Sequence, residues 1–240
     1  TTMFAMFWDA RNFNRDIGSW DVSSVENMGE MFRGAQIFTN GDSNSINNWD
    51  VSDVKSMNQM FRGAREFDQP LNNWDVRKVE NMGGMFYGAR EFNQPLNSWV
   101  TDTLKVINNM FRDAVNFDQP LSNWYISGVK QLQNVFLNAT NFNQNLGDWD
   151  VSEVTTMSNM FRSANGKFNN GGVDSLKDWN VSKVVNFQQM FEGLIDFNQP
   201  LNNWTLKSGQ NIIMRRMFKN AKAFNQPLNN WDVSNLSLIH

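Results

Sequence analysis

The sequence predicts an α/β repeat solenoid, in which the chain winds in stacked coils of about 25 residues. Tryptophan recurs with nearly constant spacing, at positions 20, 49, 74, 99, 124, 149, 179, 204 and 231. A Met-Phe pair recurs with the same period, at positions 6–7, 31–32, 60–61, 85–86, 110–111, 160–161, 190–191 and 217–218. A unit of this length is too small to bury Trp, Met and two Phe alone, so neighbouring units must stack and share a core.

The apolar spacing changes within each unit, which predicts two kinds of element. Trp74 and Val76 flank Asp75, and this alternation predicts a short strand with both apolar side chains on one face. The next apolar residues are spaced three or four positions apart, as on one face of a helix or 3₁₀ turn, and they are Val79, Met82, Phe86 and Ala89. We expect parallel strands from successive coils on one face of the solenoid, short helices or 3₁₀ turns on the other, and right-handed winding.

Signals at the element boundaries support this order. Ser23 with Glu26 has the spacing of a helix capping box. Pro95 lies within the segment 92–96, Phe-Asn-Gln-Pro-Leu, and cannot donate to a strand ladder. This segment is therefore predicted to be the return turn that precedes the next strand.

The whole chain, residues 1–240, is predicted to form a single solenoid of about nine repeats. The first repeat is partial, at 1–16, and the last is incomplete, at 228–240. Extra residues near 39–45 and 166–175 are rich in Gly, Asn and Ser and predict loop expansions between coils. Neither end has the polar cap that a solenoid terminus needs, so we expect the sequence to be a fragment of a longer repeat array.

Composition excludes several functional classes. The formal net charge of −3 lacks the basic excess typical of nucleic-acid binding, and no apolar run is long enough to span a membrane. The chain has no Cys and its one His is His240, which excludes thiol catalysis, His-containing triads and Cys or His metal centres. We expect no cofactor and no enzymatic activity. Hydrolysis by two carboxylates, such as Asp50 and Asp75, would need one raised pKa in a cleft, and equivalent exposed Asp residues give no such asymmetry.

The repeat resembles a known family. Leu71-x-x-Trp74-x-Val76 is similar to the leucine-rich-repeat strand pattern Leu-x-x-Leu-x-Leu, and Val-x-x-Met-x-x-Met-Phe-x-Gly-Ala at 54–64 completes the unit. The chain resembles the BspA-like leucine-rich-repeat family over essentially its whole length, and its Trp-Asp-Val-Ser and Phe-Asn-Gln-Pro-Leu segments are most similar to repeats of mycoplasma-type surface lipoproteins. The resemblance implies a leucine-rich-repeat-like right-handed superhelix and a cell-surface or extracellular module for adhesion or protein recognition.

The best candidates for binding lie at the outward strand position between Trp and the next apolar residue. This position, called here the Asp row, contains Asp21, Asp50, Asp75, Val100, Tyr125, Asp150, Asn180, Thr205 and Asp232. Stacked carboxylates about 5 Å apart repel, so hydrogen bonds from the following Ser or backbone, a bound cation or a basic partner must offset the repulsion. Val100 and Tyr125 interrupt the acidic residues, and this break is either drift or a recognition hot spot. The candidate partner-binding residues on the concave face are Asp50, Asp75, Val100, Thr101, Tyr125, Ser127 and Asp150.

Three other rows favour structural roles. The Trp and Met-Phe rows are expected to form the core. Short polar residues after the second Phe are expected to stack and bond to the turn backbone, and they are Asn14, Asp68, Asn93, Asp118, Asn143, Asn169, Asn198 and Asn225. The residues that follow Met-Phe form a mostly basic row, interpreted as a solvated helical edge, with Arg33, Arg62, Tyr87, Arg112, Leu137, Arg162, Glu192 and Lys219.

Together these features predict a non-catalytic surface or secreted repeat protein. It would mediate protein-protein recognition or adhesion by binding a protein or other macromolecule through its concave sheet. The alternative is a structural spacer or shell component that assembles laterally with other chains. Nucleic acid is not an expected partner, and no transmembrane segment is expected.

Overall fold

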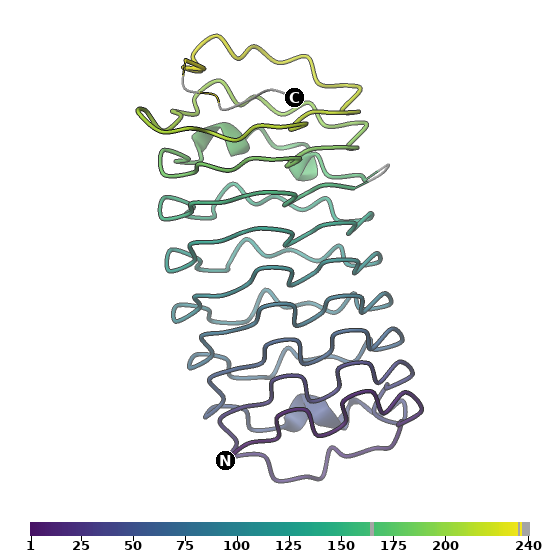
Figure 1. Ribbon diagram of the computed structural model, residues 1–240. Coiled ribbons are helices and arrows are strands. Elements are labelled where there is room, and N and C mark those ends of the chain that lie inside the picture. The colour runs from purple at the N-terminus through teal and green to yellow at the C-terminus, as the bar shows by residue number, and fades with distance from the viewer. Residues whose placement is uncertain (164–165, 235, 237–240) are drawn as a thin grey trace.

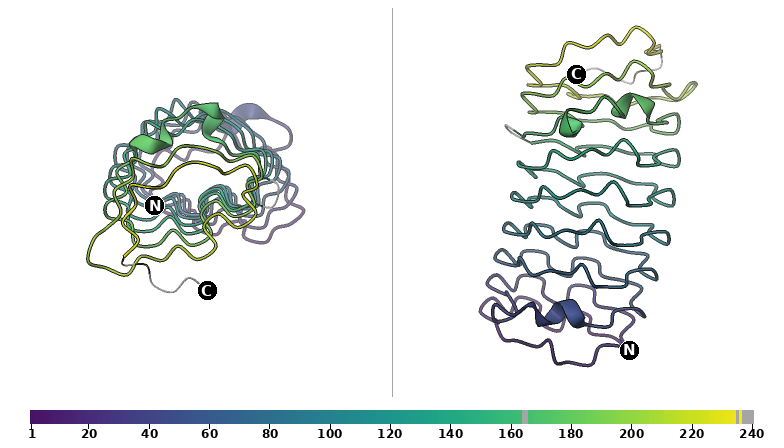
Figure 2. Two further views of the ribbon diagram at one scale, coloured as in Figure 1. Left: turned by 90° about the horizontal axis from the view of Figure 1, so that it is seen from above. Right: turned by 180° about the vertical axis from the view of Figure 1, so that it is seen from behind.

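The computed structural model describes residues 1–163, 166–234 and 236. The chain winds in successive coils that stack into one elongated body, with the first and last described coils at opposite ends (Figure 1). Seen along the stack, the coils superimpose as flattened loops around a common interior (Figure 2). The predicted incomplete last repeat, 228–240, lies partly outside the described residues.

The predicted α/β fold class is wrong. The described residues form no α-helix and no β-strand, and their named elements are three 3₁₀ turns, η1 (Asn44–Asn48), η2 (Asn170–Gly172) and η3 (Leu176–Asp178). Parallel pairing is limited to isolated bridges of single residues, such as Asn27 with Ser56. The coils therefore carry neither a sheet on one face nor helices on the other, and the strand implied by the leucine-rich-repeat resemblance is absent from this part of the chain.

Residues with positive φ prevent the predicted helix. Glu30 (φ 56°) and Gly34 (φ 76°) lie in the left-handed region, and so do Gln59 (φ 54°) and Gly63 (φ 73°) in the next coil. An α-helix requires negative φ at every position, so two such residues in most coils interrupt it. Gly, Asn and Asp tolerate positive φ best, and they occupy most of the equivalent positions.

Along this backbone, the N–H groups alternate between hydrogen bonds to the next coil and hydrogen bonds within their own coil. In the segment 28–34, every second N–H donates to a carbonyl of the next coil, with Met28 N to Ser56 O at 2.9 Å, Glu30 N to Asn58 O at 2.8 Å, Phe32 N to Met60 O at 2.9 Å and Gly34 N to Arg62 O at 2.7 Å. The intervening amides close turns within the coil, as Met31 N does on Met28 O at 3.3 Å. Because buried amides need partners, this pattern holds each coil to the next without regular secondary structure.

The predicted strand at Trp74–Val76 fails for a related reason. Trp74 N bonds to Leu71 O at 3.1 Å, and Val79 N bonds to Val76 O at 2.9 Å. The three residues therefore lie between two turns and are too short a stretch to pair as a strand with the neighbouring coil.

The Trp and Met-Phe rows form the core, as predicted. The ring of Phe61 stacks on Phe32 at 5.6 Å and on Phe86 at 5.8 Å between centroids. Trp124 is 3 % exposed, stacks on Trp99 at 6.0 Å, and donates its indole N–H to a carbonyl of the preceding coil, Leu96 O, at 3.0 Å. The same indole bond recurs in other coils, from Trp74, Trp99, Trp149, Trp179, Trp204 and Trp231. Each Trp thus both fills the interior and joins two coils.

The polar row after the second Phe is also structural, as predicted. Asp68 Oδ1 accepts from Asn93 N, Asn93 Oδ1 from Asp118 N, and Asp118 Oδ1 from Asn143 N, each at 2.9 Å. Each side chain therefore satisfies a backbone amide of the next coil.

Both predicted expansions are built around a buried Asn. Asn40 Oδ1 accepts from Ile17 N at 2.9 Å, and Asn170 Oδ1 accepts from Leu146 N at 2.8 Å. Because each Asn is fully buried and bonded to the preceding coil, the extra residues attach to the stack without interrupting it. Among the described residues, no helix is long and apolar enough to cross a membrane.

Candidate functional site

The acidic members of the Asp row accept local hydrogen bonds. Asp50 Oδ1 accepts from Ser52 N at 3.1 Å and Asp150 Oδ1 from Ser152 N at 3.0 Å. Asp75 accepts from Arg77 N at 3.2 Å and also pairs with the Arg77 guanidinium at 2.5 Å. The predicted local hydrogen bonds are therefore present, and they form turns in which the carboxylate bonds to the backbone two residues later.

These hydrogen bonds lower the pKa of the carboxyls below its ordinary value. For Asp50 and Asp150 the main cause is the hydroxyl of the following Ser, with its backbone N–H second. For Asp75 the main cause is the Arg77 guanidinium. Each interaction favours the charged carboxylate, which offsets part of the repulsion along the row.

Val100 and Tyr125 interrupt this arrangement in two consecutive coils. Both side chains point to solvent, with 46 % and 56 % of the residue exposed. Thr101 is instead 2 % exposed, and its hydroxyl donates to Tyr125 O at 3.0 Å and accepts from Tyr125 N at 2.8 Å. Thr101 thus holds the backbone beneath Tyr125 and does not itself face a partner. Ser127 is half-buried.

The coil stack aligns the candidate residues along one face. Asp50, Asp75, Val100, Tyr125 and Asp150 occupy the same position in five consecutive coils, so an apolar pair lies between acidic neighbours. Within the described residues, no group of three or more His, Cys, Asp or Glu is placed to hold a metal ion.

A second group of side chains gathers on the basic row, called here the edge column. It consists of Trp8, Arg33, Arg62, Tyr87, Arg112, Leu137, Arg162, Glu192 and Lys219. The guanidinium carbons of Arg62 and Arg112, from the coils before and after, lie 4.6 and 4.7 Å from the ring centroid of Tyr87. Two cations on one aromatic ring make this a fixed, positively charged part of the column.

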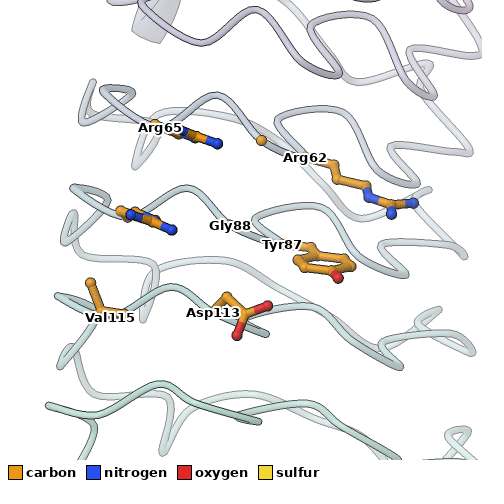
Figure 3. Close-up of a pocket in the computed structure, with 8 residues that line it drawn as sticks. Arg62, Arg65, Tyr87, Gly88, Asp113 and Val115 are labelled. Carbon is orange, nitrogen blue, oxygen red and sulfur yellow. The ribbon is translucent and has the colours of Figure 1, made fainter.

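Two hollows adjoin the ring of Tyr87. The arginine hollow has a volume of about 460 Å³, and its lining includes Arg62, Arg65, Tyr87, Arg90, Asp113 and Val115. Figure 3 shows Arg62 and Tyr87 together at one side, with Arg65, Asp113 and Val115 around the opening. The amide hollow has a volume of about 430 Å³, and its lining includes Asn58, Gln59, Asn81, Asn108 and Asn109 as well as Arg62, Tyr87 and Arg112.

A family comparison places the chain among known repeat proteins. The family described as "Mycoplasma protein of unknown function, DUF285" matches residues 1–45, 37–149, 69–175 and 132–240. The chain belongs to this family. The overlapping matches along the DUF285 chain agree with its repeat organisation. No curated protein and no solved structure shows a significant match.

The edge column of this DUF285 chain is a site that the sequence analysis did not identify. The row itself was visible in the sequence, but a helical edge would have spread its side chains into solvent. In the structure each coil adds one residue directly beside the last, so Tyr87 meets the Arg of both neighbouring coils. The available signal was Tyr87, an aromatic residue with Arg at the same repeat position in the coils before and after it.

Proposed function

We propose that the chain is a non-catalytic surface or secreted repeat protein that recognises another macromolecule through the face of the Asp row. One observation carries this proposal: Val100 and Tyr125 expose apolar and aromatic surface at a position where neighbouring coils have a hydrogen-bonded Asp. The face no longer depends on a sheet, since the coil stack alone aligns these residues.

The chemistry of this face matches a protein interface. Tyr is enriched at binding hot spots, where it loses water on binding, and charged residues are more common at the rim. Asp75 and Asp150 lie on the coils that flank the apolar pair, and their lowered pKa keeps them charged at neutral pH. They would orient a basic partner, while Tyr125 would supply the central contact.

The BspA-like resemblance supports the proposed location. The similarity of the Leu71-x-x-Trp74-x-Val76 run to such repeats favours a cell-surface or extracellular protein, although the strand of that repeat type does not form here. The cell-surface or extracellular location therefore rests on sequence similarity alone and is part of the proposal.

Binding by this face can be tested with Tyr125→Ala. The immobilised chain is exposed to extracellular proteins, retained proteins are identified by mass spectrometry, and one is then titrated against each variant. Tyr125→Ala should weaken binding by more than about 1 kcal/mol while the unfolding midpoint stays nearly unchanged, because the side chain faces solvent. Tyr125→Asp is a matched variant, since it restores the residue found in most other coils, and it should also lose binding.

The control is Arg112→Ala, on the edge column. If Tyr125→Ala bound as tightly as the parent while Arg112→Ala abolished binding, the Asp-row proposal would be wrong. The alternative function, a spacer that assembles laterally, is distinguished by sedimentation of the isolated chain. A spacer should associate with itself without any added partner, whereas a recognition module should sediment as a single species.

A further inference from the structure

We propose that the arginine hollow and the amide hollow together bind an acidic oligosaccharide, with a sulfate or carboxylate group at the arginines and sugar hydroxyls at the amides. This site uses different residues from the Asp row and does not depend on the function proposed above. Three features of the molecule support it: the arrangement around Tyr87, the charges of the arginine hollow and the hydrogen-bonding groups of the amide hollow.

Tyr87 fixes two like charges near each other. Arg62 and Arg112 each stack on the ring at less than 5 Å from its centroid. The planar guanidinium stacks well on an aromatic ring and keeps its N–H groups free at the edge, where they can grip a planar or tetrahedral anion. Arg62 also donates to Gln59 Oε1 at 2.5 Å, which further limits its rotation. The cations are thus positioned before any anion arrives.

The arginine hollow carries more positive than negative charge. Arg62, Arg65 and Arg90 line it, against one acidic side chain, Asp113. Within the described residues, neither Arg65 nor Arg90 has a carboxylate within 4.0 Å, whereas Asp113 Oδ2 lies 3.5 Å from Arg112 Nε. An anionic group in the hollow would therefore meet available charged donors.

The amide hollow offers neutral hydrogen-bonding groups, which can bind the hydroxyls of a sugar. Asn58, Gln59, Asn81, Asn108 and Asn109 each carry a side-chain donor and an acceptor, as sugar hydroxyls do. Arg62 and Tyr87 line both hollows, so one ligand can occupy the two together. Each hollow also lies within the size range usual for small-ligand sites.

The same geometry disfavours other anionic ligands. A nucleic-acid base would need a free aromatic face, but both faces of Tyr87 are covered by arginines. An acidic peptide would gain from free backbone amides at the rim, but Gly63 N already bonds to Tyr87 O and Gly88 N to Arg112 O, each at 2.7 Å. A ligand recognised through hydroxyls and one anionic group fits best.

The test is calorimetric titration of the full chain with four probes. These are a heparin-derived sulfated tetrasaccharide, a polyuronic tetrasaccharide, a neutral tetrasaccharide and inorganic sulfate. A single-stranded DNA and a polyglutamate of matched charge are titrated as comparison polyanions. We expect one site per chain for an acidic tetrasaccharide, no binding of the neutral one, and at least tenfold weaker binding of inorganic sulfate. Preference for the sulfated or the carboxylated probe identifies the anionic group, and binding of either supports the proposal.

Three variants locate the binding. The double variant Arg65→Gln with Arg90→Gln should weaken tetrasaccharide binding at least tenfold, and its exposed positions should leave the unfolding midpoint unchanged. Asn58→Ala with Asn108→Ala should weaken the tetrasaccharide but leave inorganic sulfate unchanged. Arg162→Gln is the matched control, because this residue lies in the same column but pairs with Glu192, and it should bind as the parent does.

Three results with the unmodified chain would overturn the proposal. They are no binding of either acidic tetrasaccharide, equal affinity for inorganic sulfate and the tetrasaccharides, and equal affinity for a single-stranded DNA or a polyglutamate of matched charge. The last result would show that the surface binds polyanions in general and that the amide hollow does not recognise sugar hydroxyls. A loss of binding in Arg162→Gln equal to that in the double variant would do the same.

Discussion

The contacts in the interior of the stack repeat from coil to coil, whereas the contacts in the edge column differ from coil to coil. In the interior, Phe stacks on Phe and Trp donates to the preceding coil in one unit after another. In the edge column, which is built on the same repeat, the contact changes along the stack: Arg33 covers Trp8, two arginines cover Tyr87, and Glu192 pairs with Lys219. The difference shows that uniform rows build the stack, whereas variable positions on its surface give individual coils their chemistry.

The largest expected effect separates a Trp of the interior from a Trp of the edge column. Trp124→Ala should lower the free energy of unfolding by about 3–5 kcal/mol, because it leaves a cavity between coils and removes the bond to Leu96 O. Trp8→Ala, at a residue 54 % exposed, should lower it by less than about 1 kcal/mol. Denaturant unfolding of both variants checks this. A shift of the thermal midpoint below about 2 °C for Trp124→Ala would show that the ring is not a core residue.

A smaller effect is expected in the polar row of the turns. Asp118 Oδ1 accepts from Asn143 N at 2.9 Å and from Gln144 Nε2 at 2.8 Å. Asp118→Ala leaves Asn143 N without its acceptor, while Gln144 Nε2 keeps its bond to Asp118 O at 3.0 Å. The loss should lower the free energy of unfolding by about 1–3 kcal/mol. Asp118→Asn keeps a carbonyl oxygen at the same place and should remain close to the parent. Equal losses in both variants would indicate that the charge, rather than the hydrogen bond, is what the row requires.

The smallest effect is expected at the exposed Asp row, and it depends on pH. The Ser52 hydroxyl and backbone N–H lower the pKa of Asp50 from 3.8, so its contribution to stability is present above that value and is lost as the pH falls through the folded-state pKa. Asp50→Asn keeps the turn, as Asn180 does naturally with Ser182, but does not titrate. Thermal midpoints at pH 5 and pH 3 should fall slightly more for the parent than for Asp50→Asn. An identical fall would exclude this contribution.

The repeat period and the core could be predicted from the sequence, but the path of the backbone could not. Buried Trp, Met and Phe recur at spacings that any stacked coil must keep. Apolar residues three positions apart, however, fit both a helix and a chain of consecutive turns. The distinguishing signal was the residue type at positions such as Gly34 and Gly63, where positive φ stops a helix.

The candidate site was predictable only in part, for similar reasons. The bond of Asp50 to Ser52 follows from local spacing, so sequence reasoning found it. Thr101 was interpreted as part of the outward surface, although it stands where the neighbouring coils have Val76 and Ile126, which are buried. The stacking of Tyr87 between arginines depends on how coils align, and local spacing does not contain that information.

The coil-to-coil hydrogen bonds also determine how the molecule would respond to mechanical force. They run between neighbouring coils, such as Phe61 N to Met85 O at 2.9 Å, and therefore lie along the stack rather than across it. Tension along the stack acts on all junctions in series, but a coil at an end has a neighbour on one side only, so coils should peel off from the ends in sequence rather than rupture together. Each coil of about 25 residues would release roughly 85 Å of extended chain. The protein would then lengthen in regular steps under load while its remaining coils stay folded.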